Sequence, residues 1–340
     1  MKYSFSDDYS EGAHPRILEL LTQTNLDQQA GYGEDAICIK AQELIKAAIK
    51  NPDATVHFVS GGTQANNIAL SSMLKPYESV ITAESAHINV HEAGAVESNG
   101  HKINALPTKD GKITAEQIQE FLDLHFPIHM AKPKVVSITY PTELGTLYTK
   151  AELKRISTLC KKNDLYLYLD GARLGVGLTS QESDLTLPEL SELVDMFYIG
   201  GTKNGALLGE AIVINKKELQ ANFSYYIKQH GALLAKGRVL GTQFVGLFSD
   251  SLYFDLAKHA NLMATKLSKG ITQAGYSFLT HSATNQIFPI FPNQLITKLQ
   301  KNYLFYPWQK IDSNSTAIRL VTSWATKEAA VDEFLKDLHK

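Results

Sequence analysis

Cysteine is scarce in this sequence, and no part of it is apolar over a long run. Its 340 residues include only two cysteines, Cys38 and Cys160, which lie far apart. That excludes a disulfide framework, leaves no metal-binding spacing and indicates a reducing compartment. No apolar run approaches the roughly 20 residues of a membrane span, and the N-terminus has no apolar signal core. We therefore expect a cytoplasmic protein that binds neither a metal nor a membrane.

An excess of charge of either sign is also lacking. Lysine and arginine number 33, aspartate and glutamate 35, and the net charge is −2. Such a balance gives no electrostatic basis for binding nucleic acid. The hydrophobic content of 44% and charged content of 20% are ordinary for a globular protein. The chain is long enough for two domains with buried cores, and we expect its partner to be a small molecule.

Short apolar runs alternate with helical patterns over most of the chain. Seven runs have the length and composition of strands: residues 56–59, 79–82, 103–106, 135–140, 165–169, 196–199 and 211–214. Helical patterns precede the first run, at residues 15–21 and 37–49. The alternation predicts an α/β fold, in which a mostly parallel seven-stranded sheet lies between helices.

The pattern changes in the last third of the chain. A long helical stretch is predicted over residues 242–274, followed by irregular segments, a short strand over 318–322 and a final helix over 327–338. We interpret this part as a smaller C-terminal α+β domain. The expected division is a large domain over residues 1–240 and a small one over 241–340.

Two of the predicted strands lead into residues that suit one chemistry. The strand over 165–169 ends on Asp170, and a glycine-flanked Lys203 follows the strand over 196–199. The carboxyl ends of parallel strands meet at one edge of a sheet, where ligands bind. A desolvated lysine is a competent Schiff-base nucleophile, and an aspartate can keep the pyridine nitrogen of pyridoxal phosphate protonated. Taken alone, Asp170 would be interpreted as a helix cap and Lys203 as a surface lysine. Together they predict a pyridoxal-phosphate site.

Other candidates surround this pair in the sequence. Gly62 and Thr63 open a predicted helix, and the bare amides of such a turn suit a cofactor phosphate. His87 follows the strand over 79–82 and could stack on a cofactor ring and move protons. Arg173 and Arg319 could each clamp a substrate carboxylate. The plainer readings are an N-cap for Thr63 and surface positions for the histidine and the arginines.

The order and spacing of these residues resemble the threonine aldolases, fold-type I pyridoxal-phosphate enzymes of the β-eliminating lyase group. The resemblance covers nearly the whole chain. Its markers are Ser6-Asp7, Tyr32-Gly33-Glu34-Asp35, Gly62-Thr63-Gln64-Ala65-Asn66, Ala86-His87, Glu92-Ala93-Gly94, Asp170-Gly171-Ala172-Arg173, Thr202-Lys203, Lys236-Gly237-Arg238 and Arg319-Leu320-Val321-Thr322.

The resemblance implies a role for each catalytic candidate. Lys203 would hold the cofactor covalently, Asp170 would pair with its ring nitrogen, and His87 would stack on the ring. Gly62 and Thr63 would hold the phosphate.

Further cofactor and substrate contacts are implied in the same way. Arg173 and Thr202 would complete the cofactor site, and Arg238 and Lys228 of a neighbouring subunit would help to hold the phosphate. For the substrate, the implied residues are Ser6, Tyr32, Arg173 and Arg319. Residues 1–30 would contribute to the site, and Tyr32 would reach it across a dimer interface. A homo-oligomer, dimer or tetramer, is therefore expected.

One segment departs from the family pattern. Many members carry a second active-site histidine after the strand over 135–140, but residues 141–145 here contain none. The base for the substrate β-hydroxyl would then be His87 or a water that it orients, with a water held by Thr142 or Glu143 as the alternative. An imidazole is available near neutral pH, which favours His87.

The resemblance implies an aldolase that cleaves L-threonine, L-allo-threonine and related β-hydroxy-α-amino acids to glycine and an aldehyde. The same lysine and aspartate would also serve a β-eliminating lyase or an aminotransferase. A third hypothesis is a non-catalytic protein that keeps the fold.

Overall fold

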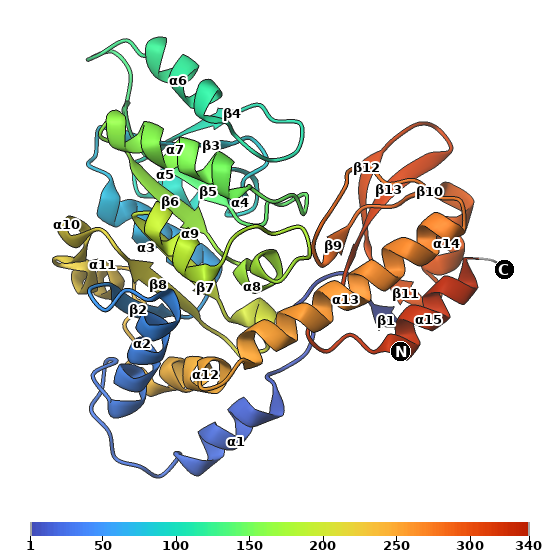
Figure 1. Ribbon diagram of the computed structural model, residues 1–340, viewed down its shortest axis with the longest axis horizontal. Helices are drawn as coiled ribbons and strands as arrows, with labels where there is room; N and C mark the ends of the chain where they lie inside the picture. Colours follow the sequence, from blue (N-terminus) through green and yellow to red (C-terminus); the bar gives the residue numbers. More distant parts are fainter. Residues whose placement is uncertain (1, 339–340) are drawn as a thin grey trace.

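The computed structural model describes residues 2–338 and centres on a seven-stranded sheet (Figure 1). Its strand order is β2-β8-β7-β6-β5-β3-β4. Only β8 runs antiparallel to its neighbours, β7 and β2, whereas the other adjacent pairs are parallel. The predicted mostly parallel seven-stranded sheet is therefore confirmed. Its strands are β2 (Thr55–Val59), β3 (Glu78–Ala83), β4 (Lys102–Leu106), β5 (Lys132–Thr139), β6 (Tyr166–Asp170), β7 (Met196–Gly200) and β8 (Glu210–Ile214).

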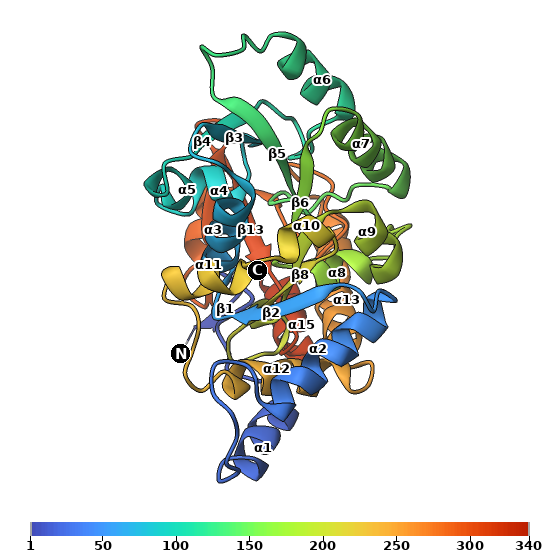
Figure 2. The same ribbon diagram turned by 90° about the vertical axis from the view of Figure 1, so that its left-hand side faces the viewer.

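Helices cover both faces of this sheet (Figure 2). One face carries α2 (Ala36–Ile49), α7 (Lys150–Lys162) and α9 (Leu187–Leu193), and the other carries α3 (Gly62–Met73), α5 (Ala95–Ser98) and α11 (Phe223–Gln229). Because both faces are covered, the central strands are mostly apolar. Every residue of β7 and β8 is buried, including Glu210 at the start of β8. The other helices of this region are α1 (Pro15–Gln23), α4 (His87–Val90), α6 (Ala115–Asp123), α8 (Leu174–Leu178), α10 (Lys217–Gln220) and the 3-10 turn η1 (Thr202–Asn204).

The C-terminal part forms a second, smaller sheet with its own buried cluster. Strand β13 pairs antiparallel with β10, β12 and β9. The N-terminus joins this region, because β1 (Tyr3–Ser4) pairs with β11 and Phe5 is buried in the same cluster. The elements are β9 (Gln286–Ile287), β10 (Ile290–Pro292), α14 (Asn293–Leu299), β11 (Tyr303–Leu304), β12 (Tyr306–Lys310), β13 (Ser315–Val321) and α15 (Glu328–Asp337).

The single helical stretch predicted over residues 242–274 is wrong. The structure has two helices there, α12 (Arg238–Phe248) and α13 (Leu252–Gln273). The break falls at a polar Ser-Asp-Ser sequence, in which the Ser249 hydroxyl donates to the carbonyl of Val245 at 2.6 Å and Asp250 pairs with Arg16. Short polar side chains that bond to the backbone favour helix ends.

The two buried clusters meet along these helices. Phe244 and Leu247 of α12 belong to the cluster of the large sheet, whereas Met263 and Leu267 of α13 belong to the C-terminal cluster. Figure 1 shows α13 running from one region to the other. The division at residues 240 and 241 stays a prediction.

Two absences hold for residues 2–338. None of the helices there is both long enough and apolar enough to cross a membrane. Within the same range, no group of His, Cys, Asp and Glu side chains is arranged to hold a metal ion.

Candidate active site

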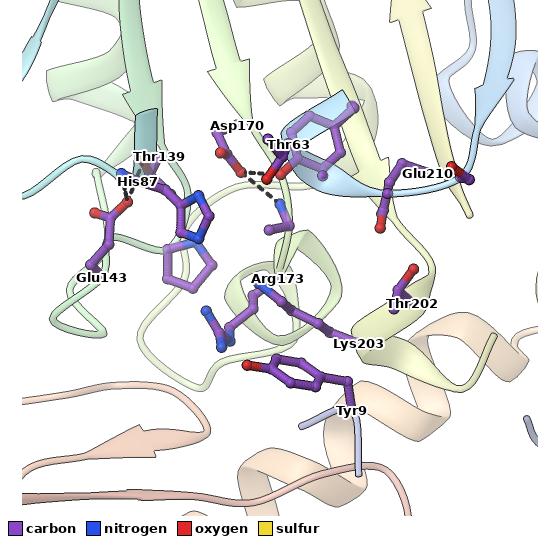
Figure 3. A pocket seen from close by; sticks show the side chains of 16 residues that line it. Tyr9, Thr63, His87, Thr139, Glu143, Asp170, Arg173, Thr202, Lys203 and Glu210 are labelled. Carbon is purple, nitrogen blue, oxygen red and sulfur yellow. Dashed lines mark hydrogen bonds between the residues drawn. The ribbon is translucent and has the colours of Figure 1, made fainter. Parts of the chain in front are cut away.

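A cavity of about 250 Å³ opens at the carboxyl ends of β5, β6 and β7, beside the start of α3 (Figure 3). It brings together eight of the predicted residues: Gly62, Thr63, His87, Glu143, Asp170, Arg173, Thr202 and Lys203. The rest of its lining is Tyr9, Ser60, Gly61, Thr139, Pro141, Ala172, Tyr198 and Glu210. The strand ends therefore meet as the parallel sheet predicts.

Asp170 ends β6 and is fixed by three hydrogen-bond donors. Oδ1 accepts from the Tyr198 hydroxyl at 2.6 Å and from the Ala172 amide at 3.0 Å, and Oδ2 accepts from the Asn66 amide at 2.9 Å. The Ala172 contact is the local one that a plain turn would supply. The other two come from β7 and α3, so the fold holds this carboxylate rigidly in the cavity.

Lys203 lies in η1, directly after β7. It is half-buried, and both its burial and the nearby Arg173 charge lower the pKa of its ammonium group. Its other charged neighbours, Asp8, Asp170 and Glu210, oppose that shift. Burial also raises the pKa of Glu210, to about 7. A lysine with a lowered pKa more readily supplies the neutral amine that attacks a carbonyl.

His87 begins α4 and contacts two glutamates. Its Nδ1 lies 2.9 Å from Oε1 of the buried Glu92. Its backbone amide donates to Oε1 of Glu143 at 2.8 Å. Figure 3 shows the imidazole at the cavity wall, near Glu143. Both the imidazole ring and the backbone amide of His87 are therefore held by hydrogen bonds.

Gly62 and Thr63 form the first turn of α3, where the amides have no partner within the helix. Thr63 makes no N-cap hydrogen bond, because the cap position is Gly61. A Cβ on Gly62 would lie 3.1 Å from the Tyr198 hydroxyl. The glycine thus lets the helix start approach the tyrosine that holds Asp170, and the turn offers an anion site.

Arg173 is paired with a residue that the sequence did not reveal. Its Nε and Nη2 donate to the two oxygens of Asp8 at 2.7 and 3.0 Å, and Asn285 also donates to Asp8 at 2.9 Å. Burial acts to raise the pKa of Asp8, but the charges of Arg173 and Lys203 outweigh it and lower the pKa below its ordinary value. The N-terminal segment is thereby tied to the cavity wall.

Ser6 and Arg319 lie together but do not line the cavity. Nη2 of Arg319 donates to the Ser6 carbonyl at 3.1 Å. The guanidinium also lies 5.2 and 5.4 Å from the ring centroids of Tyr306 and Trp308. Their role in binding substrate stays a prediction.

Tyr32, Lys228 and Arg238 also lie outside the cavity lining. The Lys228 ammonium is 4.9 Å from the centroid of the half-exposed Tyr32 ring. Arg238 donates to three backbone carbonyls, those of residues 24, 25 and 27. Contributions from these residues to a site would have to come from a neighbouring subunit, and they remain predictions.

Several residues at or behind the site were not singled out from the sequence: Asp8, Tyr9, Asn66, Glu92, Tyr198 and Glu210. Asn66 and Glu92 lie within the family markers, which was a usable signal. Tyr198 lies inside an apolar strand, and Asp8 acts over a separation of 165 residues. Local sequence gave no sign of these two roles.

The residues present fit pyridoxal phosphate. The cavity holds a lysine with a lowered pKa, a rigidly held carboxylate, an imidazole and a helix start whose amides suit a phosphate. Buried Asp170 would hold the proton on the ring nitrogen, and Lys203 would hold the carbonyl carbon.

Comparisons with known proteins agree with this geometry. The model of the family described as β-eliminating lyase matches residues 5–293. The low specificity L-threonine aldolase of Pseudomonas sp. (strain NCIMB 10558) is 35% identical, over 98% of this chain and 96% of its own.

Solved structures give the same result. A Leishmania major threonine aldolase is 46% identical and superimposes with a TM-score of 0.98, over 99% of this chain and 98% of its own. A Thermus thermophilus aspartate aminotransferase is 14% identical, with a TM-score of 0.72 over 99% of this chain and 90% of its own. That likeness shows the fold alone and confirms the predicted fold-type I architecture. The chain therefore belongs to the β-eliminating lyase family and, within it, to the threonine aldolases.

Proposed function

We propose that this chain is a pyridoxal-phosphate-dependent aldolase that cleaves L-threonine, L-allo-threonine and related β-hydroxy-α-amino acids to glycine and an aldehyde. The observation that carries the proposal is the shared cavity of Lys203 and Asp170, in a chain related over its whole length to threonine aldolases. When bound, the cofactor supplies an electron sink for the bonds at the substrate Cα.

The roles of the cavity residues follow from their chemistry. Lys203 would hold the cofactor, because its lowered pKa favours the neutral amine that attacks a carbonyl. Asp170 holds the proton on the ring nitrogen, and its three donors keep it in place. His87, which lines the cavity, would stack on the bound ring and would take the proton of the β-hydroxyl. Arg173, already oriented by Asp8, binds the substrate carboxylate.

The proposal includes a homo-oligomer with active sites at subunit interfaces. Support comes from Tyr32, Lys228 and Arg238, which lie outside the cavity of their own chain. In an oligomer these side chains would complete the site of a neighbouring subunit. Sedimentation of the pure protein would give its oligomeric state, and a monomer with full activity would contradict this part.

The test is incubation of the purified holoprotein with L-threonine and with L-allo-threonine, followed by measurement of glycine and acetaldehyde. Borohydride should trap the cofactor on the wild-type chain and on Lys217→Ala, a control at an exposed lysine. Lys203→Ala should lose both the trapped label and cleavage. Labelling that persists in Lys203→Ala would show that another lysine holds the cofactor.

Product analysis also separates the alternatives. A β-eliminating lyase would form pyruvate and ammonia from serine-like or cysteine-like substrates, and an aminotransferase would form a keto acid. A non-catalytic protein would bind cofactor or ligand and release no product.

A further inference from the structure

The buried carboxylate of Glu92 contacts the imidazole of His87 through a hydrogen bond. The Glu92 side chain is 0% exposed, and its Oε1 lies 2.9 Å from His87 Nδ1. His87 itself lines the cavity with a side chain that is 36% exposed. A carboxylate at Nδ1 can only accept, so Nδ1 carries the proton and Nε2 keeps its lone pair when the ring is neutral.

Glu92 is joined to Asp170 through one amide. The Asn66 side-chain nitrogen lies 2.7 Å from Glu92 Oε1 and 2.9 Å from Asp170 Oδ2. The Tyr168 hydroxyl lies 2.8 Å from the Asn66 side-chain oxygen, and this fixes the orientation of the amide. A continuous hydrogen-bonded path therefore runs from His87 through Glu92 and Asn66 to Asp170.

A charge at position 92 is costly for the fold. Burying a carboxylate costs free energy unless it is fully paired. Oε2 of Glu92 is buried and has no hydrogen-bond partner among residues 2–338. A glutamine would have nearly the same shape and would accept from Nδ1 at lower cost. The negative charge therefore calls for a reason beyond packing.

We propose that Glu92 is a positioning residue for His87: it keeps the proton on Nδ1, leaves Nε2 as the acceptor on the cavity side, and stabilises the imidazolium that forms. The assignment rests on the proposed function. In the cleavage direction, Nε2 takes the proton of the substrate β-hydroxyl. The hydroxyl oxygen then forms the aldehyde carbonyl as the Cα–Cβ bond breaks. The electron pair of the broken bond stays on Cα. A proton from solvent completes glycine at Cα, and the imidazolium returns its own proton to solvent.

The charge of Glu92 matters at the moment the imidazole becomes positive. The titratable and charged groups near His87 include Glu92 at Nδ1, Glu143 at the backbone amide, His91 with its ring centroid 5.5 Å away, and Asp170 behind Asn66. Arg173, Lys203 and Glu210 line the same cavity. Among residues 2–338, only Glu92 contacts the ring through a side-chain hydrogen bond. Asn66 links it to Asp170, so the two carboxylates are held at a fixed separation.

The proposal is tested with Glu92→Gln, which keeps the shape and removes the charge, and with Glu92→Leu, which also removes the acceptor. The control is Glu97→Gln, an exposed glutamate in the neighbouring helix α5. We expect kcat for threonine cleavage to fall ~10- to 100-fold in Glu92→Gln, part of the ~10²–10⁴ that general-base catalysis supplies. KM should stay within about threefold, since Glu92 does not contact substrate.

A second readout is independent of the reaction. Nitrogen-15 NMR of the cofactor-free protein, with the His87 signals assigned through His87→Phe, reports which ring nitrogen is protonated. We expect Nδ1–H in the wild type and a mixture of both tautomers in Glu92→Leu. The acidic limb of the pH profile should move to lower pH in Glu92→Gln, because a base that loses a nearby negative charge becomes weaker.

Two results would overturn the assignment: an Nε2–H tautomer in the wild type, or turnover and pH profile of Glu92→Gln equal to those of Glu97→Gln. If Glu92→Leu does not fold, Glu92→Gln decides. A wild-type protein that cleaves no threonine would overturn the proposed function, whereas the tautomer of His87 would still test the orienting role of Glu92.

Discussion

Two carboxylates at neighbouring strand ends line the same cavity but differ in their hydrogen-bond partners. Asp170, at the end of β6, has donors on both oxygens. Glu143, in the loop after β5, accepts on Oε1 from the His87 amide and the Thr139 hydroxyl, at 2.8 and 3.0 Å. Its Oε2 is buried without a partner among residues 2–338.

The surroundings of Glu143 change the pKa of its carboxyl group. Burial, and then the charge of Asp170, raise the pKa of the Glu143 carboxyl to about 6. One strand end thus carries a carboxylate held by three donors. The other carries a carboxyl group whose pKa is raised toward neutral pH. Asp170 and Glu143 both line the cavity, and substitutions distinguish their roles.

The largest effect should come from His87, which contacts Glu143 through its backbone. His87→Phe should keep the stacking and lose the base, so cofactor affinity should change little while turnover falls by ~10²–10⁴. Glu143→Gln, which keeps an acceptor for the His87 amide, should be mild. Steady-state kinetics of both variants on L-threonine would show this. A mild His87→Phe and a severe Glu143→Gln would move the base to the end of β5.

Asp170→Asn should rank next. The neutral amide would leave the ring nitrogen of the cofactor without its charged partner and weaken the electron sink. Turnover should fall ~100-fold or more, the effect of a few kcal/mol at a buried charged contact. The measurement is kcat at saturating cofactor. Near-normal turnover would mean that this carboxylate serves only to order the start of the following turn.

The contrast between the two strand ends also explains what the sequence could predict. Asp170 and Lys203 directly follow apolar strands in glycine-rich turns, and Gly62 and Thr63 open a helix. Each of these is a local pattern, and parallel pairing brings strand ends together whatever the rest of the chain does. The fold and this part of the cavity were therefore accessible from residue order alone.

The other wall of the cavity was not accessible in that way. Asp8 meets Arg173 across 165 residues and Asn285 across 277. Such contacts depend on how the N-terminal strand pairs with β11 in the C-terminal region, and no local sequence pattern predicts that pairing. The break between α12 and α13 is different, because its cause is a local three-residue polar sequence that a long helical pattern on either side obscures.

A pH-dependent stability difference would test the unusual state of Glu143. The folded pKa is about 6, against an ordinary value of 4.5. Between these values the unfolded chain releases the proton first, so the wild type loses stability as pH rises from 4.5 to 6. The loss, relative to Glu143→Gln, should be on the order of 2 kcal/mol and constant at higher pH.

Urea unfolding of the cofactor-free proteins at acidic and alkaline pH would measure this difference. Glu97→Gln is the control, because Glu97 is exposed in the short helix α5. A wild-type-to-Glu143→Gln difference that does not change with pH would show that Glu143 ionises in the fold as it does in water. The two strand ends would then differ in geometry alone.

The smallest effect should come from Tyr198→Phe, which makes Asp170 more like Glu143 by removing one of its donors. The lost hydrogen bond is short, 2.6 Å, and goes to a carboxylate. Such bonds contribute about 1.5–3 kcal/mol, but the Asn66 and Ala172 contacts remain and keep Asp170 in place, so we expect turnover to fall only ~10-fold. Tyr168→Phe is the matched control, because its hydroxyl bonds Asn66 and reaches Asp170 only through that amide. Tyr168→Phe should lower turnover less than Tyr198→Phe does. Equal losses in the two variants would show that the position of Asp170 depends on the whole network and that no single donor dominates.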